Sequence, residues 1–148
     1  MDNALKETLI GWAEEYNDPK YFQEDPIIFP TRFAGLLNEG KATLADVEIS
    51  ALLSAHLAWG RRAMIVRDCD RMFEEMDWRP YDYVMNGEYR DENVSLHRTI
   101  KWSQFAQICE NLRNIYAERT SLEGLTDTDI RCRIFGQKED RKAPNKKI

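Results

Sequence analysis

The chain has 148 residues and a net charge of −5, with 43% hydrophobic, 11% aromatic and 32% charged residues. This length suits one domain, and a domain of this size can bury enough surface to need neither a metal nor a disulfide staple. Its three cysteines form no CxxC pair, which excludes a disulfide framework and the usual zinc or iron–sulfur spacings. No uncharged run approaches the length of a membrane span, so we expect a cytoplasmic protein with no cofactor, no metal and no membrane partner.

The first predicted element is a helix over residues 3–16. Its large apolar side chains recur at intervals of three and four residues, which is the spacing of one helix face. Asp2 or Asn3 supplies the N-cap. The helix ends before Pro19, because the residue preceding a proline is pushed out of the helical region. We expect its apolar face to pack onto the core.

The next segment, residues 20–30, contains two prolines beside a run of apolar residues. This pattern favours an extended segment whose apolar side chains, Ile27 to Phe29, press against the core. A strand is the competing interpretation, but no second strand candidate exists to pair with it. Thr31 can then cap a short helix that runs through Leu37.

The strongest helix signal begins at Thr43. Thr43 and Asp46 have nearly the spacing of a capping box, and residues 47–59 are apolar nearly all round. A helix without a wide polar face belongs at the centre of a fold. We therefore predict a buried central helix over about residues 44–59. Gly60 interrupts the chain before an amphipathic helix over residues 61–76.

Three further helices are predicted. A short one runs from Pro80 to Asn86, a long one from residue 99 or 102 to residue 119, and a last short one from residue 126 or 128 to residue 135. The predicted fold class is all-α, an irregular multi-helix array around the buried central helix. We divide the chain into a helical domain at residues 1–136 and a basic polar tail, or a truncated continuation, at residues 137–148.

Charge is distributed unevenly along the chain. Residues 131–148 contain seven Lys or Arg against two acidic residues, a net charge of +5, which leaves −10 for residues 1–130. The body is therefore acidic and the C-terminal segment basic. A basic segment of this kind suits either a nucleic-acid-binding arm or a linker into further protein.

Few residues in the sequence suggest a binding or catalytic site. His56 lies in the central helix, where a core-edge position is more frequent than ligand contact, and no neighbouring ligand residues support a metal site. Arg61 and Arg62 follow Gly60 and could bind phosphate, but arginines of this segment could equally pair with nearby acids. No GxSxG, P-loop, GxGxxG or HExxH motif occurs, so we predict no catalytic residues.

Three stretches together resemble a bacterial family, domain of unknown function 2400. They are DPIIFP at residues 25–30, DVEISALLSAHLAWGRR at residues 46–62, and the end of the long helix at TSLE, residues 120–123. The resemblance covers about residues 20–148. Longer members of that family resemble helix-hairpin-helix DNA glycosylases in their later portion.

This resemblance implies that the chain corresponds to the N-terminal half of a helix-hairpin-helix glycosylase-like fold. The central helix is similar to the glycosylase helix that leads towards the flipped base, with His56 in place of the usual polar amide. Such enzymes use a lysine or an aspartate on later helices. The sequence contains no equivalent of those helices, and we expect it to be truncated before the chemistry.

Two hypotheses for the function follow. In the first, the chain is a DNA-associated fragment without the catalytic part. The candidate nucleic-acid contacts are then His56, Arg61, Arg62, Lys142, Lys146 and Lys147. The acidic body opposes phosphate binding. In the second, the chain is a non-enzymatic interaction or structural module whose exposed apolar surface binds a partner. We also predict a homodimer, because the other helices offer too little apolar surface to cover the central helix on every side.

Overall fold

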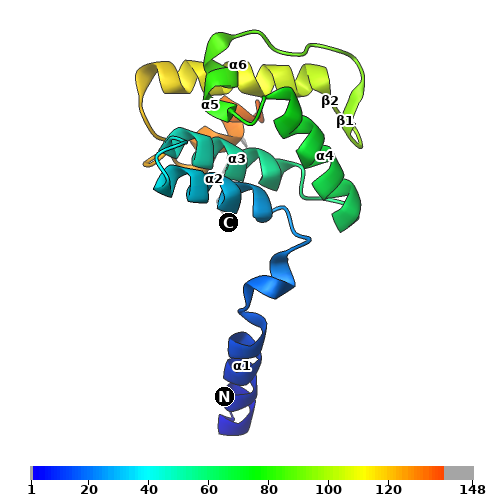
Figure 1. The fold of residues 1–148 in the computed structure, drawn as a ribbon, viewed down its shortest axis with the longest axis vertical. Helices are drawn as coiled ribbons and strands as arrows, with labels where there is room; N and C mark the ends of the chain where they lie inside the picture. Colours follow the sequence, from blue (N-terminus) through cyan, green and yellow to red (C-terminus); the bar gives the residue numbers. More distant parts are fainter. Residues whose placement is uncertain (1, 139–148) are drawn as a thin grey trace, which may run out of the picture.

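The computed structural model describes residues 2–138, and within them the chain is mostly helical, with one short two-stranded sheet (Figure 1). In chain order the elements are α1 (Asn3–Tyr16), the 3₁₀-helix η1 (Pro19–Phe22), α2 (Ile28–Asn38), α3 (Leu44–His56), α4 (Arg62–Glu75), α5 (Pro80–Asn86), β1 (Ser95–His97), β2 (Ile100–Lys101), α6 (Trp102–Glu118), α7 (Asp127–Asp129) and the π-helix η2 (Ile130–Ile134). The mainly helical class predicted from the sequence is confirmed. None of the helices described is both long and apolar enough to cross a membrane.

Local signals place several helix ends where the sequence predicts them. The Thr43 hydroxyl accepts a hydrogen bond from the Asp46 N–H at 3.3 Å, and the Asp46 carboxylate accepts the Thr43 N–H at 2.8 Å, which completes the capping box. Asp46 also accepts the backbone N–H of Tyr81 at 2.9 Å. One buried carboxylate therefore joins the start of α3 to the start of α5. Gly87 ends α5 with a φ of 75°, a left-handed conformation that suits glycine.

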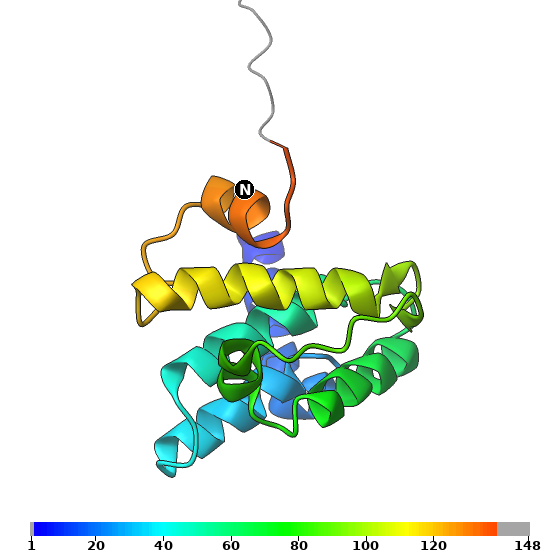
Figure 2. The ribbon, with the colours of Figure 1, turned by 90° about the horizontal axis from the view of Figure 1, so that it is seen from above.

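α6 lies along one side of the hydrophobic core, with α5 beside it (Figures 1 and 2). The apolar stripe of α6 is buried throughout: Trp102, Phe105, Ile108, Leu112, Ile115 and Tyr116. From α3 the core receives Ile49 and Leu53, and from α4 it receives Met72 and Phe73. These side chains are fully buried, so α3, α4 and α6 form one packed unit.

The expectations for residues 20–37 are wrong in two respects. Ile28 and Phe29 belong to α2 and are not extended, and Thr31 lies within the helix instead of capping it. Pro30 falls in the first turn of α2, where backbone N–H groups have no partner within the helix, so a proline there removes no helical hydrogen bond. Phe29 is buried as expected, whereas Ile27 is 54% exposed.

α3 is covered on one side only, which corrects the expectation of a helix buried all round. Ile49, Ser50, Leu53 and Ser54 are buried, while Ala51 and Ala55 are exposed. The helix also ends at His56, three residues earlier than predicted. The exposed side consists of small apolar residues, which is why its sequence gives no polar face.

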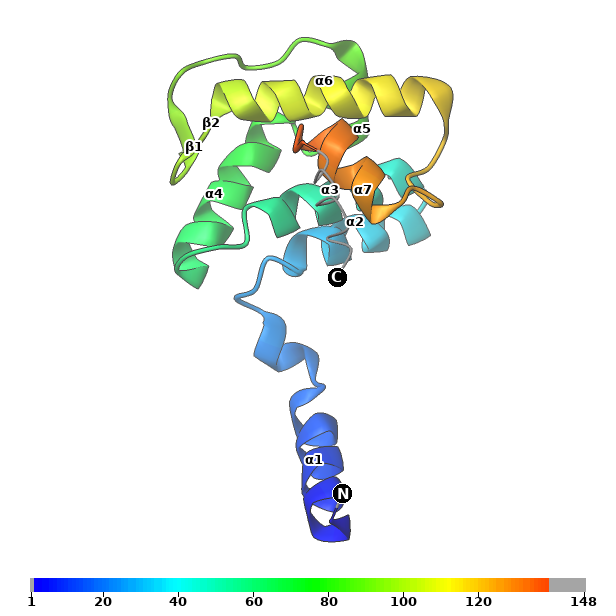
Figure 3. The same ribbon diagram turned by 180° about the vertical axis from the view of Figure 1, so that it is seen from behind.

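α1 has the predicted bounds but not the predicted packing. Asp2 caps it by accepting the Ala4 N–H at 3.2 Å, and the helix then runs to Tyr16. None of its residues is buried, and Figures 1 and 3 show it projecting from the other helices with no element beside it. Helical periodicity establishes that this segment has an apolar face but not what covers the face.

Strands β1 and β2 form a hairpin that the sequence analysis did not predict. His97 pairs with Ile100, so that Arg98 and Thr99 make the turn, and the Ser95 hydroxyl donates to the Arg98 carbonyl at 2.7 Å. Strands of three and two residues are too short to show an alternating pattern. The hairpin buries Leu96 and His97 against α4 and the start of α6.

Candidate functional site

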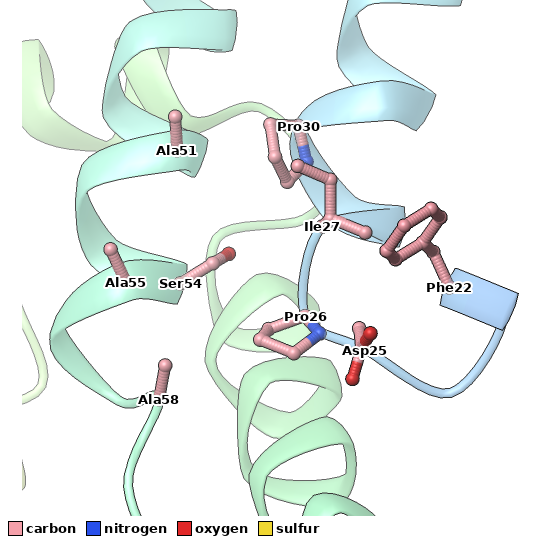
Figure 4. Close-up of a pocket in the computed structure, with 9 residues that line it drawn as sticks. All are labelled: Phe22, Asp25, Pro26, Ile27, Pro30, Ala51, Ser54, Ala55 and Ala58. Carbon is pink, nitrogen blue, oxygen red and sulfur yellow. The ribbon is translucent and has the colours of Figure 1, made fainter. Parts of the chain in front are cut away.

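The uncovered side of α3 forms one wall of an apolar groove (Figure 4). Small residues line this wall: Ala51, Ser54, Ala55 and Ala58. Residues between η1 and the first turn of α2 line the opposite wall: Phe22, Asp25, Pro26, Ile27 and Pro30. The groove has a volume of about 550 Å³, and nearly all its surface is carbon. Small side chains on one wall would allow another helix to approach the α3 backbone closely.

An ion pair involves one residue of the groove wall, Asp25. The Arg62 guanidinium contacts the Asp25 carboxylate at 3.1 Å, joining the start of α4 to the chain segment before α2. Phe22 and Ile27 lie at the rim and are each about half exposed. A second hollow begins on the far side of these two residues and reaches Thr31 and Gly35 of α2. The apolar surface therefore continues from α3 across the rim to α2.

A separate feature, a buried ionic cluster, lies between α4 and the hairpin. His97 is fully buried and Asp68 is only 1% exposed. The His97 ring contacts the Asp68 carboxylate through Nδ1 at 2.6 Å and the Trp59 carbonyl through Nε2 at 2.9 Å. Arg67 and Arg71 donate to the same carboxylate, and Arg71 also donates to the Leu96 carbonyl at 3.2 Å. The cluster therefore fastens the hairpin and the α3–α4 connection to α4.

Both nitrogens of the His97 ring face oxygen acceptors. Burial alone raises the pKa of Asp68, but the hydrogen bonds from Arg67, His97 and Arg71 outweigh burial and hold that pKa below its usual range. An ionised carboxylate can only accept, so Nδ1 of His97 donates to Asp68. The cluster is thus a buried carboxylate held by the His97 ring and by two arginines at its edge.

The lowered pKa of Asp68 makes stability depend on pH in acid. An unfolded aspartate has a pKa of about 3.9. Because the folded pKa is lower, the stabilisation by ionised Asp68 is complete above that value and is lost as the pH falls towards the folded pKa. We therefore expect the difference in unfolding free energy between the wild type and Asp68→Asn to be constant from pH 7 to about 5 and to shrink below about 4. Urea unfolding across this range measures it, and a constant difference down to the acid limit of folding would contradict the assignment.

The surface above the buried ionic cluster carries an exposed aromatic ring and two cations. Trp59 is 38% exposed, and its ring meets the His97 ring edge to face at 5.6 Å. The Arg98 guanidinium lies 4.3 Å from the Trp59 ring centroid. Glycine at position 60 leaves room for the Arg98 side chain, because a Cβ there would lie 2.6 Å from it. We call Trp59, Arg61 and Arg98 the Trp59 corner.

His56 occupies a different environment from the arginines. Its ring stacks on Phe135 at 4.5 Å, beside a hollow of about 320 Å³ that Gln104, Gln107 and Asn111 of α6 also line. Burial, and then the positive charge of His97, lower the pKa of His56. The ring is therefore mainly neutral at pH 7, so any charge-based contact with phosphate would come from arginines.

The residues predicted to contact nucleic acid have different partners in the structure. Arg62 pairs with Asp25, His56 stacks on Phe135, and Arg61 has no ion pair within residues 2–138. Lys142, Lys146 and Lys147 lie outside the described residues. The alternative interpretation of the arginines, pairing with nearby acids, applies to Arg67 and Arg71, which both contact Asp68.

Neither the Asp68–His97 pair nor the role of Arg98 was predicted from the sequence. One signal was present: Asp68 has the spacing of the apolar face of α4, whose buried residues are Ile65, Asp68, Cys69, Met72 and Phe73. A carboxylate among buried positions requires a partner. No pattern identifies that partner, because His97 is 29 residues away in the chain.

The described residues offer little of the chemistry that hydrolases and metalloenzymes require. Burial raises the pKa of the Cys69 thiol to about 12, so it remains protonated and unreactive at neutral pH. Burial raises the pKa of Cys109 still further. Within residues 2–138, no cluster of three or more His, Cys, Asp or Glu side chains could hold a metal ion.

Comparison with known proteins identifies the family. Residues 25–145 match the family described as "Protein of unknown function (DUF2400)". The match begins at Asp25, so it contains both walls of the groove except Phe22, together with the buried ionic cluster and the Trp59 corner, and leaves out α1 and η1. Neither the curated proteins nor the solved structures include a match. With more than half of its length matched, the chain belongs to the DUF2400 family.

Proposed function

We propose that the chain is a non-enzymatic helical interaction module that receives an amphipathic helix in the groove beside α3. The observation that carries this proposal is the apolar character of a groove lined by Ala51, Ala55 and Ala58 opposite Pro26 and Ile27. A soluble domain gains stability by covering contiguous apolar surface, and exposed patches of this kind mark partner sites.

The chemistry of the walls defines the kind of partner. Ala51 and Ala55 are one helical turn apart in α3, and Ala58 lines the groove just after the helix ends, so these small residues leave room for the large side chains of a second helix. Ile27 and Phe22 stand at the rim and would flank that helix. The partner helix is therefore expected to carry apolar residues at i, i+4, i+7 and i+11.

A designed peptide tests this proposal directly. A fluorescein-labelled amphipathic helix with leucines at that spacing is titrated with the full chain and followed by anisotropy. The wild type should bind it, and Ala55→Glu should weaken binding at least about tenfold, because a carboxylate in the apolar groove would be desolvated. Ala117→Glu places the same change on an exposed position of α6 and should bind like the wild type. Equal binding by both variants, or no binding by the wild type even at an excess of peptide that would displace a helix already in the groove, would exclude the groove as a helix-binding site.

A second candidate function is DNA association through the Trp59 corner. The exposed ring of Trp59 offers a stacking surface for a base, and Arg61 and Arg98 offer cations for phosphate. The strongly acidic body limits phosphate contact to this corner and to the basic C-terminal segment. A glycosylase-like role would need this DNA contact first.

Anisotropy of labelled duplex and single-stranded DNA across a salt series separates the two candidates. If the Trp59 corner binds DNA, affinity should fall with salt, and Arg98→Ala should reduce the slope of that dependence by about one. Arg113→Ala removes an arginine from the second half of α6, outside the Trp59 corner, and should leave the slope unchanged. No binding at low salt would remove this second candidate without affecting the groove. Cleavage of a damaged-base duplex by the chain would contradict a non-enzymatic role.

A further inference from the structure

The exposed face of α1 carries large apolar side chains in a continuous stripe. Leu5, Leu9, Trp12 and Tyr16 follow intervals of four, three and four residues and are between 44% and 55% exposed. A helix of 14 residues is marginal in water by itself, and amphipathic helices gain most of their stability from packing. The stripe has the spacing that the groove requires of a partner helix.

The chain directs its own α1 away from its own groove. Asp18 caps η1 by accepting the Lys20 N–H at 3.0 Å, and the Tyr16 and Tyr21 rings contact each other at 5.2 Å across the junction. These contacts fix the corner between α1 and η1, while Phe22 at the end of η1 already lines the groove. In Figures 1 and 3, α1 continues outward from that point. Its stripe would reach the groove of another molecule without breaking this corner.

Charges favour one direction for a helix in the groove. Glu14 and Glu15 lie in the last turn of α1. Arg62 pairs with Asp25, which lines the groove, and Arg61 is its neighbour in the chain, three residues after Ala58. Arg61 has no ion pair within residues 2–138. Cations near the C-terminus of a helix are favourable to its dipole, so the last turn of α1 fits beside Arg61.

We propose that two copies of the chain exchange their α1 helices, each helix binding in the groove of the other copy. This inference rests on the proposed function, since it names a second copy as the partner of the same groove. A reciprocal contact of this kind is two-fold symmetric, and exchange of an identical element is a low-cost route to a dimer. Half-exposed side chains of this size offer on the order of 100 Å² each. The area buried on α1 and on the groove, added over the two equal contacts, is about 1,600 Å², which is typical of a stable interface.

Light scattering of the full chain, coupled to size-exclusion chromatography, tests the exchange. The wild type should have about twice the 17.4 kDa mass of one chain. Trp12→Glu in the stripe and Ala55→Glu in the groove should each give monomers, because each removes both reciprocal contacts. Glu7→Gln, a conservative change of a charged residue of α1, should remain a dimer. Circular dichroism and cooperative melting verify that these exposed positions leave the fold intact.

Mixing the two monomeric variants distinguishes this arrangement from any other dimer. Trp12→Glu keeps an intact groove and Ala55→Glu keeps an intact α1, so a mixture can form one of the two contacts and should yield heterodimers. A monomeric wild type, variants that remain dimers, or a mixture without heterodimers would overturn the exchange. If the wild type is monomeric but binds the designed amphipathic peptide in a groove-dependent way, the proposed function stands and only the second copy as partner is rejected.

Discussion

His97→Ala is expected to destabilise the fold by about 3–5 kcal/mol, because it leaves a buried carboxylate without its closest partner. In the wild type the His97 ring contacts the Asp68 carboxylate at 2.6 Å and the Trp59 carbonyl at 2.9 Å, and both Asp68 and His97 are buried. Truncation removes both hydrogen bonds at once. It also loosens the hairpin, which the same ring fastens to α4.

The other histidine provides the matched control for this substitution. His56 is half-buried and stacks on Phe135 at 4.5 Å. His56→Ala should therefore cost only about 0.5–1.5 kcal/mol, the usual contribution of one aromatic pair. Urea unfolding followed by tryptophan fluorescence and by circular dichroism measures both variants at pH 7. If the two substitutions lower the urea midpoint of unfolding equally, the Asp68–His97 pair does not stabilise the fold as the structure indicates.

Phe73→Ala is the second substitution with a large expected effect. Phe73 is fully buried in α4, and its ring lies 5.1 Å from Phe29, 5.4 Å from Phe33 and 5.5 Å from Trp78. Replacing the ring by a methyl group leaves a cavity between α2 and α4, and such cavities cost about 3–5 kcal/mol. A loss of that size is a large part of the stability of an ordinary domain.

Val94→Ala is the control for the loss of apolar volume without a cavity. Val94 is 53% exposed, so its truncation should change the free energy of unfolding by no more than about 0.5 kcal/mol. The two variants are compared by thermal and urea unfolding. A Phe73→Ala protein as stable as Val94→Ala would mean that α2 does not pack on α4 through this aromatic cluster.

The helices could be predicted from the sequence because their signals are local. Thr43 and Asp46 cap α3 across three residues, Pro80 opens α5, and Gly87 ends it in a left-handed conformation. α6 shows the same property over a greater length, since its buried stripe repeats every three or four residues. Each of these signals is complete within one or two helical turns, so no distant contact is needed to interpret it.

The prediction for Ile28 and Phe29 failed for a reason that is also local. Prolines on both sides of an apolar run favour extended backbone in isolation. Pro30, however, lies in the first turn of α2, and burial of Phe29 and Phe33 against α4 stabilises the helix that begins just before it. Packing outweighed the local preference.

The covering of each apolar face was decided by tertiary structure alone. The residues of α3 are apolar on nearly every side, and the sequence gives no indication that Ala51 and Ala55 face outward into a groove while Ile49 and Leu53 face the core. α1 likewise has its predicted bounds, yet its stripe finds no surface within residues 2–138. Periodicity defines a face but carries no information about the surface that meets it.

The sequence by itself determined the helical class, most helix boundaries and the family resemblance, because these depend on neighbouring residues. Only the tertiary structure brought His97 to Asp68 across 29 residues and to Trp59 across 38, and placed Arg98 over the Trp59 ring. A buried charge is stable only when its partner arrives with the correct geometry, and that arrival depends on how α4, the hairpin and the α3–α4 connection pack together.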